Sequence, residues 1–268
     1  MPNANLNGTT LHFEDSGGRG PTIVFSHGLL WSCRMFDAQV AALVGAGYRV
    51  VAYDHRGQGR SADDPARSIA IETVYDDAAA LIEQLQLGPC HFAGLSMGGF
   101  VGMRLAARRP ALLRSLILME TSAEPEPVEN LPKYKRLNWT WRWLGPALIE
   151  QPVMQVMFGR PFLSDPARAA QRAEMVGRLR ANRRSIWRAV NGVIDRRGIA
   201  DELAQIRCPT TVIVGEEDRA TVPVKSERIA AAIPGATLVK IPRAGHTSSV
   251  EEPTLVTDAI LAHHARVG

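Results

Sequence analysis

The stretch HFAGLSMGGF, residues 91–100, places one serine between glycines where two different patterns meet. The residues before the serine form a short apolar run typical of a buried strand. Those after it carry apolar side chains at helical spacing until Pro110 ends the pattern. A strand that passes into a helix within about one residue forces strained backbone angles on the corner residue. Because Gly94 and Gly98 permit close backbone approach, the stretch predicts that Ser96 stands on the tip of a sharp turn.

Outside this turn, apolar runs alternate with helix-like segments. PTIVFSHG (residues 21–28) and YRVVAY (residues 48–53) are continuous apolar runs typical of buried parallel strands. Between them and the turn, the apolar positions of residues 71–85 follow the 3.6-residue period of a helix. The alternation predicts an α/β fold with a mostly parallel sheet that helices cover on both faces.

The alternation stops between residues 121 and 207. This segment holds several prolines, helix-like spacing and four of the five tryptophans, but no clear buried strand. The two strands expected after it are too few to form a sheet alone, so we expect them to join the first sheet. The sequence therefore predicts a core made of residues 1–120 and 208–268, with a helical insertion at 121–207.

Composition narrows the possible partners and locations. The 268 residues are 46% hydrophobic, which is enough for a large core, and the net charge is only +4. No run of five or six basic residues occurs, which argues against a nucleic acid partner. Three separated cysteines without a CxxC pair predict neither disulfides nor a zinc site. With no signal peptide and no apolar run of membrane-span length, we expect a cytoplasmic protein without a membrane partner.

Two loops near the end of the chain carry the residue types that a serine nucleophile needs. A serine hydroxyl is weak until a base takes its proton, and the base works best when a third group orients it. Asp218 follows one predicted strand and His246 follows the next. Since the carboxyl ends of parallel strands share one edge of the sheet, we expect both side chains to meet Ser96 there. The acid has a rival in Glu120, which ends another predicted strand, and two adjacent alternatives in Glu216 and Glu217.

Four motifs together resemble the α/β-hydrolase fold superfamily: SHGLL (26–30), DHRGQGRS (54–61), GLSMGG (94–99), and GEED (215–218) with GHTSSVEEP (245–253). The chain order serine, aspartate, histidine is also the order of that superfamily. Within it, the core is similar to carboxylesterases, 3-oxoadipate enol-lactonases and cofactor-free perhydrolases. The resemblance implies that the insertion is a helical cap over the active site. The usual G-x-x-D spacing of the superfamily favours Asp218 as the acid, although some members carry the acid where Glu120 stands.

The same resemblance implies an oxyanion hole made of two backbone N–H groups, those of Met97 and Leu29. It implies that His27 supports the oxyanion loop, and that Asp54 and Arg56 fix a loop near the pocket. We further expect the substrate pocket to be lined by residues that are mostly in the insertion: Leu30, Trp139, Trp143, Met154, Met157 and Trp187.

Charge bears on the kind of substrate. Residues 121–207 hold 15 Lys and Arg against 9 Asp and Glu, so the insertion carries the basic charge. The arginines of RLRANRRSIWR (178–188) point in too many directions to form one pocket wall, which favours a solvated face and an apolar pocket. We therefore expect a serine hydrolase of a small, mainly neutral carboxylic ester or lactone that needs neither metal nor organic cofactor. The alternatives are an enol-lactonase-like hydrolase of a carboxylate-bearing lactone, a perhydrolase and a non-catalytic ligand-binding protein.

Overall fold

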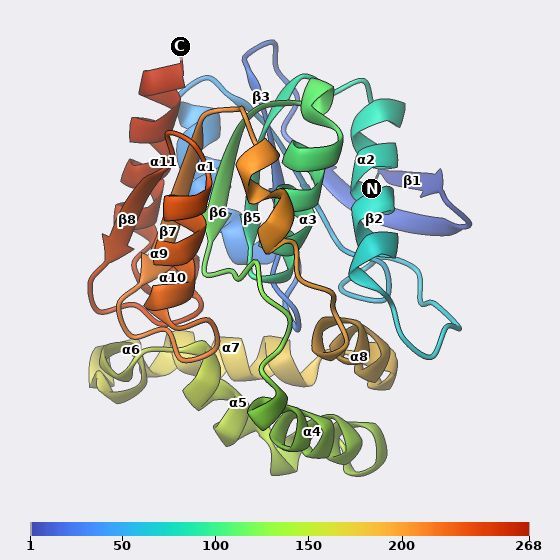
Figure 1. The fold of residues 1–268 in the computed structure, drawn as a ribbon. Coiled ribbons are helices and arrows are strands. Elements are labelled where there is room, and N and C mark those ends of the chain that lie inside the picture. Colours follow the sequence, from blue (N-terminus) through green and yellow to red (C-terminus); the bar gives the residue numbers. More distant parts are fainter. Residues whose placement is uncertain (1, 268) are drawn as a thin grey trace.

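The computed structural model describes residues 2–267 and contains one eight-stranded sheet in the order β1-β2-β4-β3-β5-β6-β7-β8 (Figure 1). Pairing is antiparallel from β1 to β2 and from β2 to β4, and parallel between all the other neighbours. The strands are β1 (Asn3–Leu6), β2 (Thr9–Asp15), β3 (Thr22–Ser26), β4 (Arg49–Tyr53), β5 (Cys90–Leu95), β6 (Leu113–Met119), β7 (Thr210–Gly215) and β8 (Thr237–Ile241).

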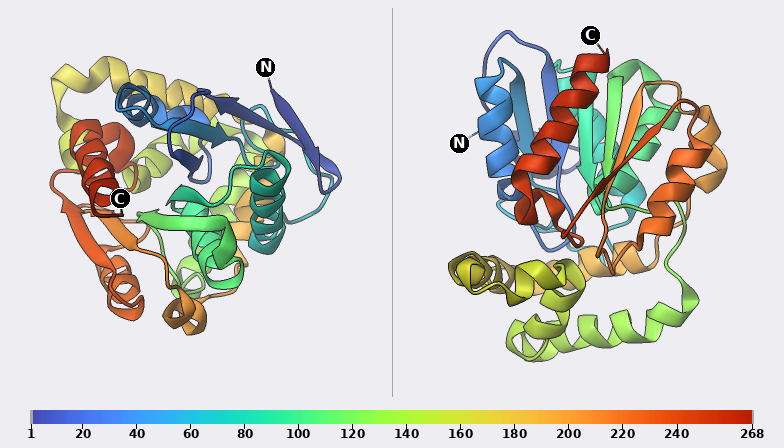
Figure 2. Two further views of the ribbon diagram at one scale, coloured as in Figure 1. Left: turned by 90° about the horizontal axis from the view of Figure 1, so that it is seen from above. Right: turned by 90° about the vertical axis from the view of Figure 1, so that its left-hand side faces the viewer.

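Helices cover both faces of the sheet, as the alternating sequence predicts. The view from above shows α1 (Asp37–Gly45) and α11 (Pro253–Val267) on one face (Figure 2). The other face carries α2 (Ile71–Gln84), α3 (Met97–Arg108) and α9 (Pro223–Ala232). Every residue of β5 and β7 is buried between these two layers, which explains why those strands are continuous apolar runs. The predicted fold class is confirmed.

A separate layer of helices lies between β6 and β7 in the chain. It consists of α4 (Leu131–Leu144), α5 (Glu150–Met157), α6 (Arg160–Ser164), α7 (Ala169–Arg180) and α8 (Trp187–Ile194). We call these five helices the cap, because they lie beyond the carboxyl ends of the parallel strands (Figures 1 and 2). The two connections to the cap are joined where the Ile199 N–H donates to the Ala123 carbonyl at 2.7 Å. The catalytic loops predicted from the sequence therefore open toward the cap.

None of the helices within residues 2–267 combines the length and the apolar character required to cross a bilayer.

Candidate active site

Ser96 occupies the sharp turn between β5 and α3. Its backbone angles, φ 53° and ψ −108°, lie where a non-glycine residue is strained. The turn is possible only because the neighbouring glycines lack side chains. A Cβ at Gly94 would lie 2.2 Å from the Gly98 carbonyl oxygen, and one at Gly98 would lie 2.0 Å from the Ser26 carbonyl oxygen. This strained turn presents the Ser96 hydroxyl at the carboxyl edge of the sheet.

Asp218 and His246 lie beside this serine, although they come from loops far along the chain. His246 Nε2 is 2.9 Å from Ser96 Oγ. On the other side of the ring, His246 Nδ1 is 3.0 Å from Asp218 Oδ1 and 2.9 Å from Oδ2. All three residues are buried. The loops after β7 and β8 therefore bring Asp218 and His246 to Ser96. An acid, a base and a hydroxyl group are hydrogen-bonded there in that order.

The Asp218 carboxylate is held in a fixed orientation by its own loop. Oδ1 accepts the backbone N–H groups of Ala220 at 2.8 Å and Thr221 at 3.0 Å. Oδ2 accepts the Thr221 hydroxyl at 2.8 Å. These donors fix the orientation of the carboxylate and leave its remaining lone pairs directed at the His246 ring.

The rival acid Glu120 has a different partner. It follows β6, is fully buried, and accepts the Gly215 N–H at 3.0 Å, so it joins the ends of β6 and β7. Burial, together with the nearby charge of Asp218, raises the pKa of the Glu120 carboxyl well above its usual value. Glu216 is exposed, and Glu217 accepts the Arg160 N–H at 2.8 Å. Among these carboxyl groups, Asp218 is the one whose oxygens contact His246 Nδ1.

A carboxyl group that the sequence did not single out holds the His246 loop. Glu251, in α10 (Ser248–Glu251), accepts the N–H groups on both sides of the histidine, from Gly245 at 2.9 Å and Thr247 at 3.1 Å. Its other oxygen accepts the Gly159 N–H at the start of α6, at 2.7 Å. Burial raises the pKa of this carboxyl to about 7. Glu251 therefore ties the histidine loop to the cap.

The loop expected to hold the oxyanion is fixed by two buried histidines. His27 Nδ1 donates to the Gly28 carbonyl at 2.7 Å, and Nε2 accepts the His55 N–H at 3.0 Å. Burial lowers the pKa of His27, so the ring is neutral and can donate through one nitrogen while accepting through the other. Leu29 in this loop lines the cavity beside Ser96, and Met97 begins α3. The two N–H groups of Leu29 and Met97 remain the donors that we expect for the oxyanion.

The cavity next to Ser96 has a volume of about 130 Å³ and is lined mostly by apolar side chains of the cap and core. Of the expected lining residues, Leu30 and Met157 contribute, whereas Met154 and Trp187 do not. Trp139 and Trp143 point outward, with 57% and 55% of their surface exposed, and Trp141 faces the cavity in their place. This correction follows from helix geometry: Trp141 is two residues from each of the others, on the opposite side of α4.

One ion pair marks the polar wall of this cavity. Arg196 donates to Glu126 at 2.9 Å, and its guanidinium lies 4.5 Å from the centre of the Phe100 ring. All three residues line the cavity, so the opposite charges leave its wall close to neutral. The arginines of the 178–188 stretch are elsewhere: Arg178 pairs with Glu174, Arg180 with Glu150 and Arg188 with Asp63.

The model of the family described as "Alpha/beta hydrolase family" matches residues 23–259. The chain belongs to the alpha/beta hydrolase family.

Several members of the alpha/beta hydrolase family are similar over almost their whole length. The enol-lactonase from Burkholderia xenovorans LB400 superposes with a TM-score of 0.90 and 28% identity, over 98% of this chain and 100% of the other. A thermophilic esterase from Thermogutta terrifontis gives a TM-score of 0.89 and 29% identity, over 99% and 97%. A protein named "Putative carbamate hydrolase RutD" from Pseudomonas syringae pv. syringae (strain B728a) is 31% identical over 244 residues, covering 87% of this chain and 89% of that protein.

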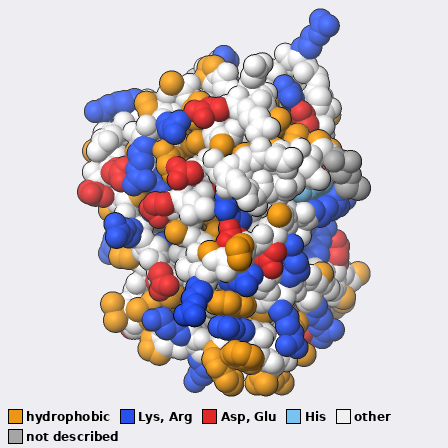
Figure 3. All heavy atoms as spheres, turned by 90° about the vertical axis from the view of Figure 1, so that its right-hand side faces the viewer, with side chains coloured by type: hydrophobic (Ala, Val, Ile, Leu, Met, Phe, Trp, Pro, Cys, Tyr) orange, Lys and Arg blue, Asp and Glu red, His pale blue; other side chains and the backbone are white. Residues whose placement is uncertain are grey.

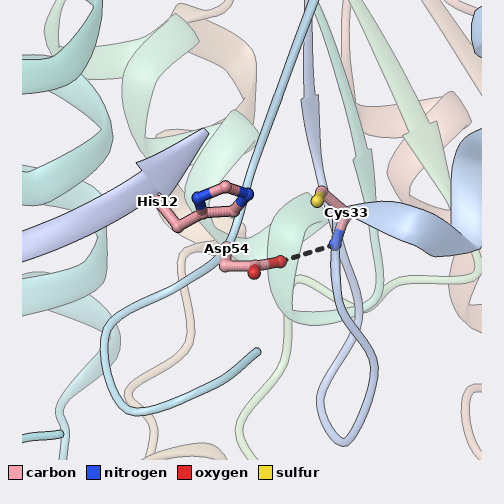
Figure 4. Close-up of side chains that lie close together, drawn as sticks. All are labelled: His12, Cys33 and Asp54. Atoms are coloured by element: carbon pink, nitrogen blue, oxygen red, sulfur yellow. Dashed lines mark hydrogen bonds between the residues drawn. The ribbon is translucent and has the colours of Figure 1, made fainter. Parts of the chain in front are cut away.

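This alpha/beta hydrolase also contains a second buried cluster with metal-ligand residue types, His12, Cys33 and Asp54 (Figure 4). The Asp54 oxygens accept the N–H groups of Cys33 and Arg60, both at 2.7 Å. Burial raises the pKa of the Cys33 thiol, which keeps it protonated, and Arg60 Nη1 lies 3.2 Å from His12 Nε2. A neutral thiol and an adjacent guanidinium do not suit a cation. The cluster fits the expected role of Asp54, which is to fix its loop.

Proposed function

We propose that this chain is a serine hydrolase that cleaves a small, mainly neutral carboxylic ester or lactone through an acyl-enzyme on Ser96. The observation that carries the proposal is the hydrogen-bond chain from Asp218 through His246 to Ser96 at the wall of an apolar cavity. Similarity to an esterase and an enol-lactonase supports the same reaction class.

The geometry supports a two-step acyl transfer. The Asp218 carboxylate accepts a hydrogen bond from the Nδ1–H group of His246, which leaves the Nε2 lone pair directed at the Ser96 hydroxyl. As Ser96 Oγ attacks the carbonyl carbon, His246 takes its proton and then gives it to the leaving alkoxide. His246 then deprotonates a water molecule, which attacks the acyl-enzyme, and the histidine returns this proton to Ser96 Oγ as the acid leaves. In a lactone the alcohol stays attached to the acyl group through the ring carbons throughout, so the second step releases a hydroxy acid.

The tetrahedral oxyanion formed in each step needs donors at the same edge of the sheet. We assign them to the backbone N–H groups of Leu29 and Met97, the second of which also lies at the N-terminus of α3. A donor of this kind contributes roughly 3–4 kcal/mol to transition-state binding. Because both are backbone groups, side-chain substitution at either position changes the pocket shape more than the donor.

The cavity supports a small and uncharged substrate. Its volume of about 130 Å³ suits a short acyl group, and its lining is mainly apolar. The one cation in the lining, Arg196, already faces the carboxylate of Glu126. A substrate carboxylate there would lose hydration while competing with Glu126, which is unfavourable.

Arg196 also supports a second candidate, hydrolysis of a carboxylate-bearing lactone, because it lines the cavity within reach of a ligand. The two candidates predict opposite preferences between a neutral ester and its ω-carboxylate analogue of similar size. We expect a higher kcat/KM for the neutral ester at both low and high salt. A preference for the anion that weakens as salt is added would instead favour the lactone with a carboxylate.

The reaction class is tested by pre-steady-state hydrolysis of p-nitrophenyl acetate. A burst of p-nitrophenol followed by slower turnover is expected, and Ser96→Ala should abolish both phases. Slow release of p-nitrophenol that Ser96→Ala leaves unchanged would favour a non-catalytic ligand-binding protein. Adding hydrogen peroxide as a second nucleophile then distinguishes perhydrolysis from hydrolysis, since both would use the same acyl-enzyme.

A further inference from the structure

The segment around α4 exposes several large apolar side chains. Of the nine large hydrophobic side chains that are exposed within residues 2–267, five fall between Val128 and Leu148. They include both exposed tryptophans, Trp139 and Trp143, and Leu144 at 56% exposure. The four elsewhere are scattered valines and a leucine. A cluster that contains exposed tryptophans marks a surface that contacts something other than water.

Helix α4 lines the cavity with one side and faces solvent with the other. Tyr134, Leu137, Asn138 and Trp141 line the cavity on the inner side. The outer side presents the two tryptophans among exposed basic residues, which are Lys135, Arg136 and Arg142. These outer residues recur at helical spacing, so they share one face. We call Lys135, Arg136, Trp139, Arg142 and Trp143 the outer cap patch.

The charge of this patch has one sign. Residues 131–149 contain four basic residues and no Asp or Glu. The Arg142 guanidinium lies 4.8 Å from the Trp143 ring centre and 4.0 Å from that of Trp187, so charge and aromatic surface are presented together. On the cap, hydrophobic and basic side chains lie side by side with few acidic ones between them (Figure 3).

We propose that the outer cap patch docks on an anionic lipid surface. Tryptophan is suited to the boundary between headgroups and acyl chains, and lysine and arginine beside it attract anionic headgroups. Docking would place the outer side of α4 against lipid while its inner side still lines the cavity. The sequence led us to expect no membrane partner because it has no run of span length, but surface docking requires no span.

A second copy of the chain fits the patch less well. In a two-fold dimer through this face, the outer side of α4 would meet itself, which would bring Lys135, Arg136 and Arg142 of each copy together without an acidic residue of the same segment. Like charges brought together in this way oppose association. An anionic lipid surface supplies both the missing negative charge, in its headgroups, and an apolar layer, in its acyl chains.

The experiment is flotation of the purified protein with vesicles of phosphatidylcholine alone or mixed with phosphatidylserine. Binding is expected with the mixed vesicles, and added salt should weaken it. Each basic residue near an anionic surface contributes roughly a fivefold gain in partition, so Lys135→Gln/Arg136→Gln should bind roughly 25-fold less. Trp139→Ser/Trp143→Ser should also lose binding. Both variants should keep wild-type hydrolysis of a soluble ester, which shows that they are folded.

Matched controls lie away from the cap. Arg114→Gln removes an exposed cation at the opposite end of the sheet, and Leu255→Ser removes an exposed apolar side chain on α11. Both should bind vesicles like the wild type. Equal binding to the two kinds of vesicle, or equal losses in control and patch variants, would overturn the proposal. So would a dimer in sedimentation that Trp139→Ser/Trp143→Ser dissociates, combined with no vesicle binding.

Vesicle binding does not depend on hydrolysis, so the docking proposal is tested independently of the proposed function. The Ser96→Ala protein should float with the mixed vesicles as the wild type does. If the protein binds the mixed vesicles but hydrolyses no ester, the docking proposal holds and the proposed function is wrong. If it hydrolyses esters but does not bind the vesicles, the docking proposal is wrong.

Discussion

Replacing Asp218 by asparagine should disable catalysis while leaving the site almost unchanged in shape. Oδ1 of Asp218 accepts two backbone N–H groups, from Ala220 and Thr221, and the side-chain oxygen of an asparagine must keep that position. Its NH₂ group would then occupy the Oδ2 position, 2.9 Å from His246 Nδ1. Nδ1 also lies 3.0 Å from the Oδ1 position, but an amide oxygen there already accepts two N–H groups with its two lone pairs. The NH₂ group therefore favours the tautomer in which Nδ1 accepts and the ring proton lies on Nε2.

The magnitude follows from this change of tautomer. With a proton on Nε2, His246 donates toward Ser96 Oγ, 2.9 Å away, and can no longer take the serine proton. In a triad with this geometry the loss amounts to roughly 10⁴-fold in kcat. The assay is steady-state hydrolysis of p-nitrophenyl acetate, with urea unfolding of the same variant to show that stability is retained.

Glu120→Gln is the matched control for Asp218→Asn. Glutamine has nearly the same shape as the buried Glu120 side chain and still accepts the Gly215 N–H, and burial already raises the pKa of the Glu120 carboxyl. We therefore expect less than about a tenfold loss of kcat. If Glu120→Gln is the crippling change while Asp218→Asn retains activity, the acid assignment is wrong and the reasoning from hydrogen-bond donors fails with it.

Three further predictions address the nucleophile, the histidine loop and the turn. Ser96→Ala and His246→Ala should each remove most activity, with the double variant hardly worse, because the two residues act as one unit; additive losses in kcat would contradict this. Glu251 keeps its proton to pH about 7 when folded but ionises near 4.5 when unfolded, so its contribution to stability falls as pH rises across this range. The free energy of unfolding of wild type minus that of Glu251→Gln should drop by up to about 3 kcal/mol between pH 4.5 and 7, measured in urea, and a rise would contradict the assignment. Gly98→Ala should destabilise by at least about 2 kcal/mol in thermal unfolding, because its Cβ meets the Ser26 carbonyl; an unchanged Tm would refute the steric argument.

The parts of the structure that the sequence predicts depend on local pattern and on strand order. Continuous apolar runs identified the buried strands, and the glycines around Ser96 identified a turn that no other residue could make. Because parallel strands end at one edge of the sheet, the sequence alone predicts that the loops of Asp218 and His246 lie beside that turn.

The pocket lining could not be predicted in the same way. Trp139, Trp141 and Trp143 look alike in sequence, and only the rotation of α4 against the core decides that the middle one faces the cavity. The pair of Glu126 and Arg196 is 70 residues apart, and it forms because the two connections of the cap run side by side. Such contacts depend on tertiary packing, which hydrophobic periodicity does not encode.

Glu251 was missed for a related reason. Its sequence neighbourhood suggested only the motif around the histidine, and an acidic residue there is usually a surface residue. Its role appears once three backbone N–H groups converge on one buried carboxyl group.

The central claim is that catalysis passes through an acyl group on Ser96, and the most direct measurement is to trap that intermediate. The wild-type protein is mixed with p-nitrophenyl acetate, quenched with acid during the burst, digested and analysed by mass spectrometry. We predict one acetyl group on the peptide that carries Ser96, in an amount equal to the burst, and none at that position in Ser96→Ala. An acetyl group located on another residue in proportion to the burst, or full turnover by Ser96→Ala, would contradict it.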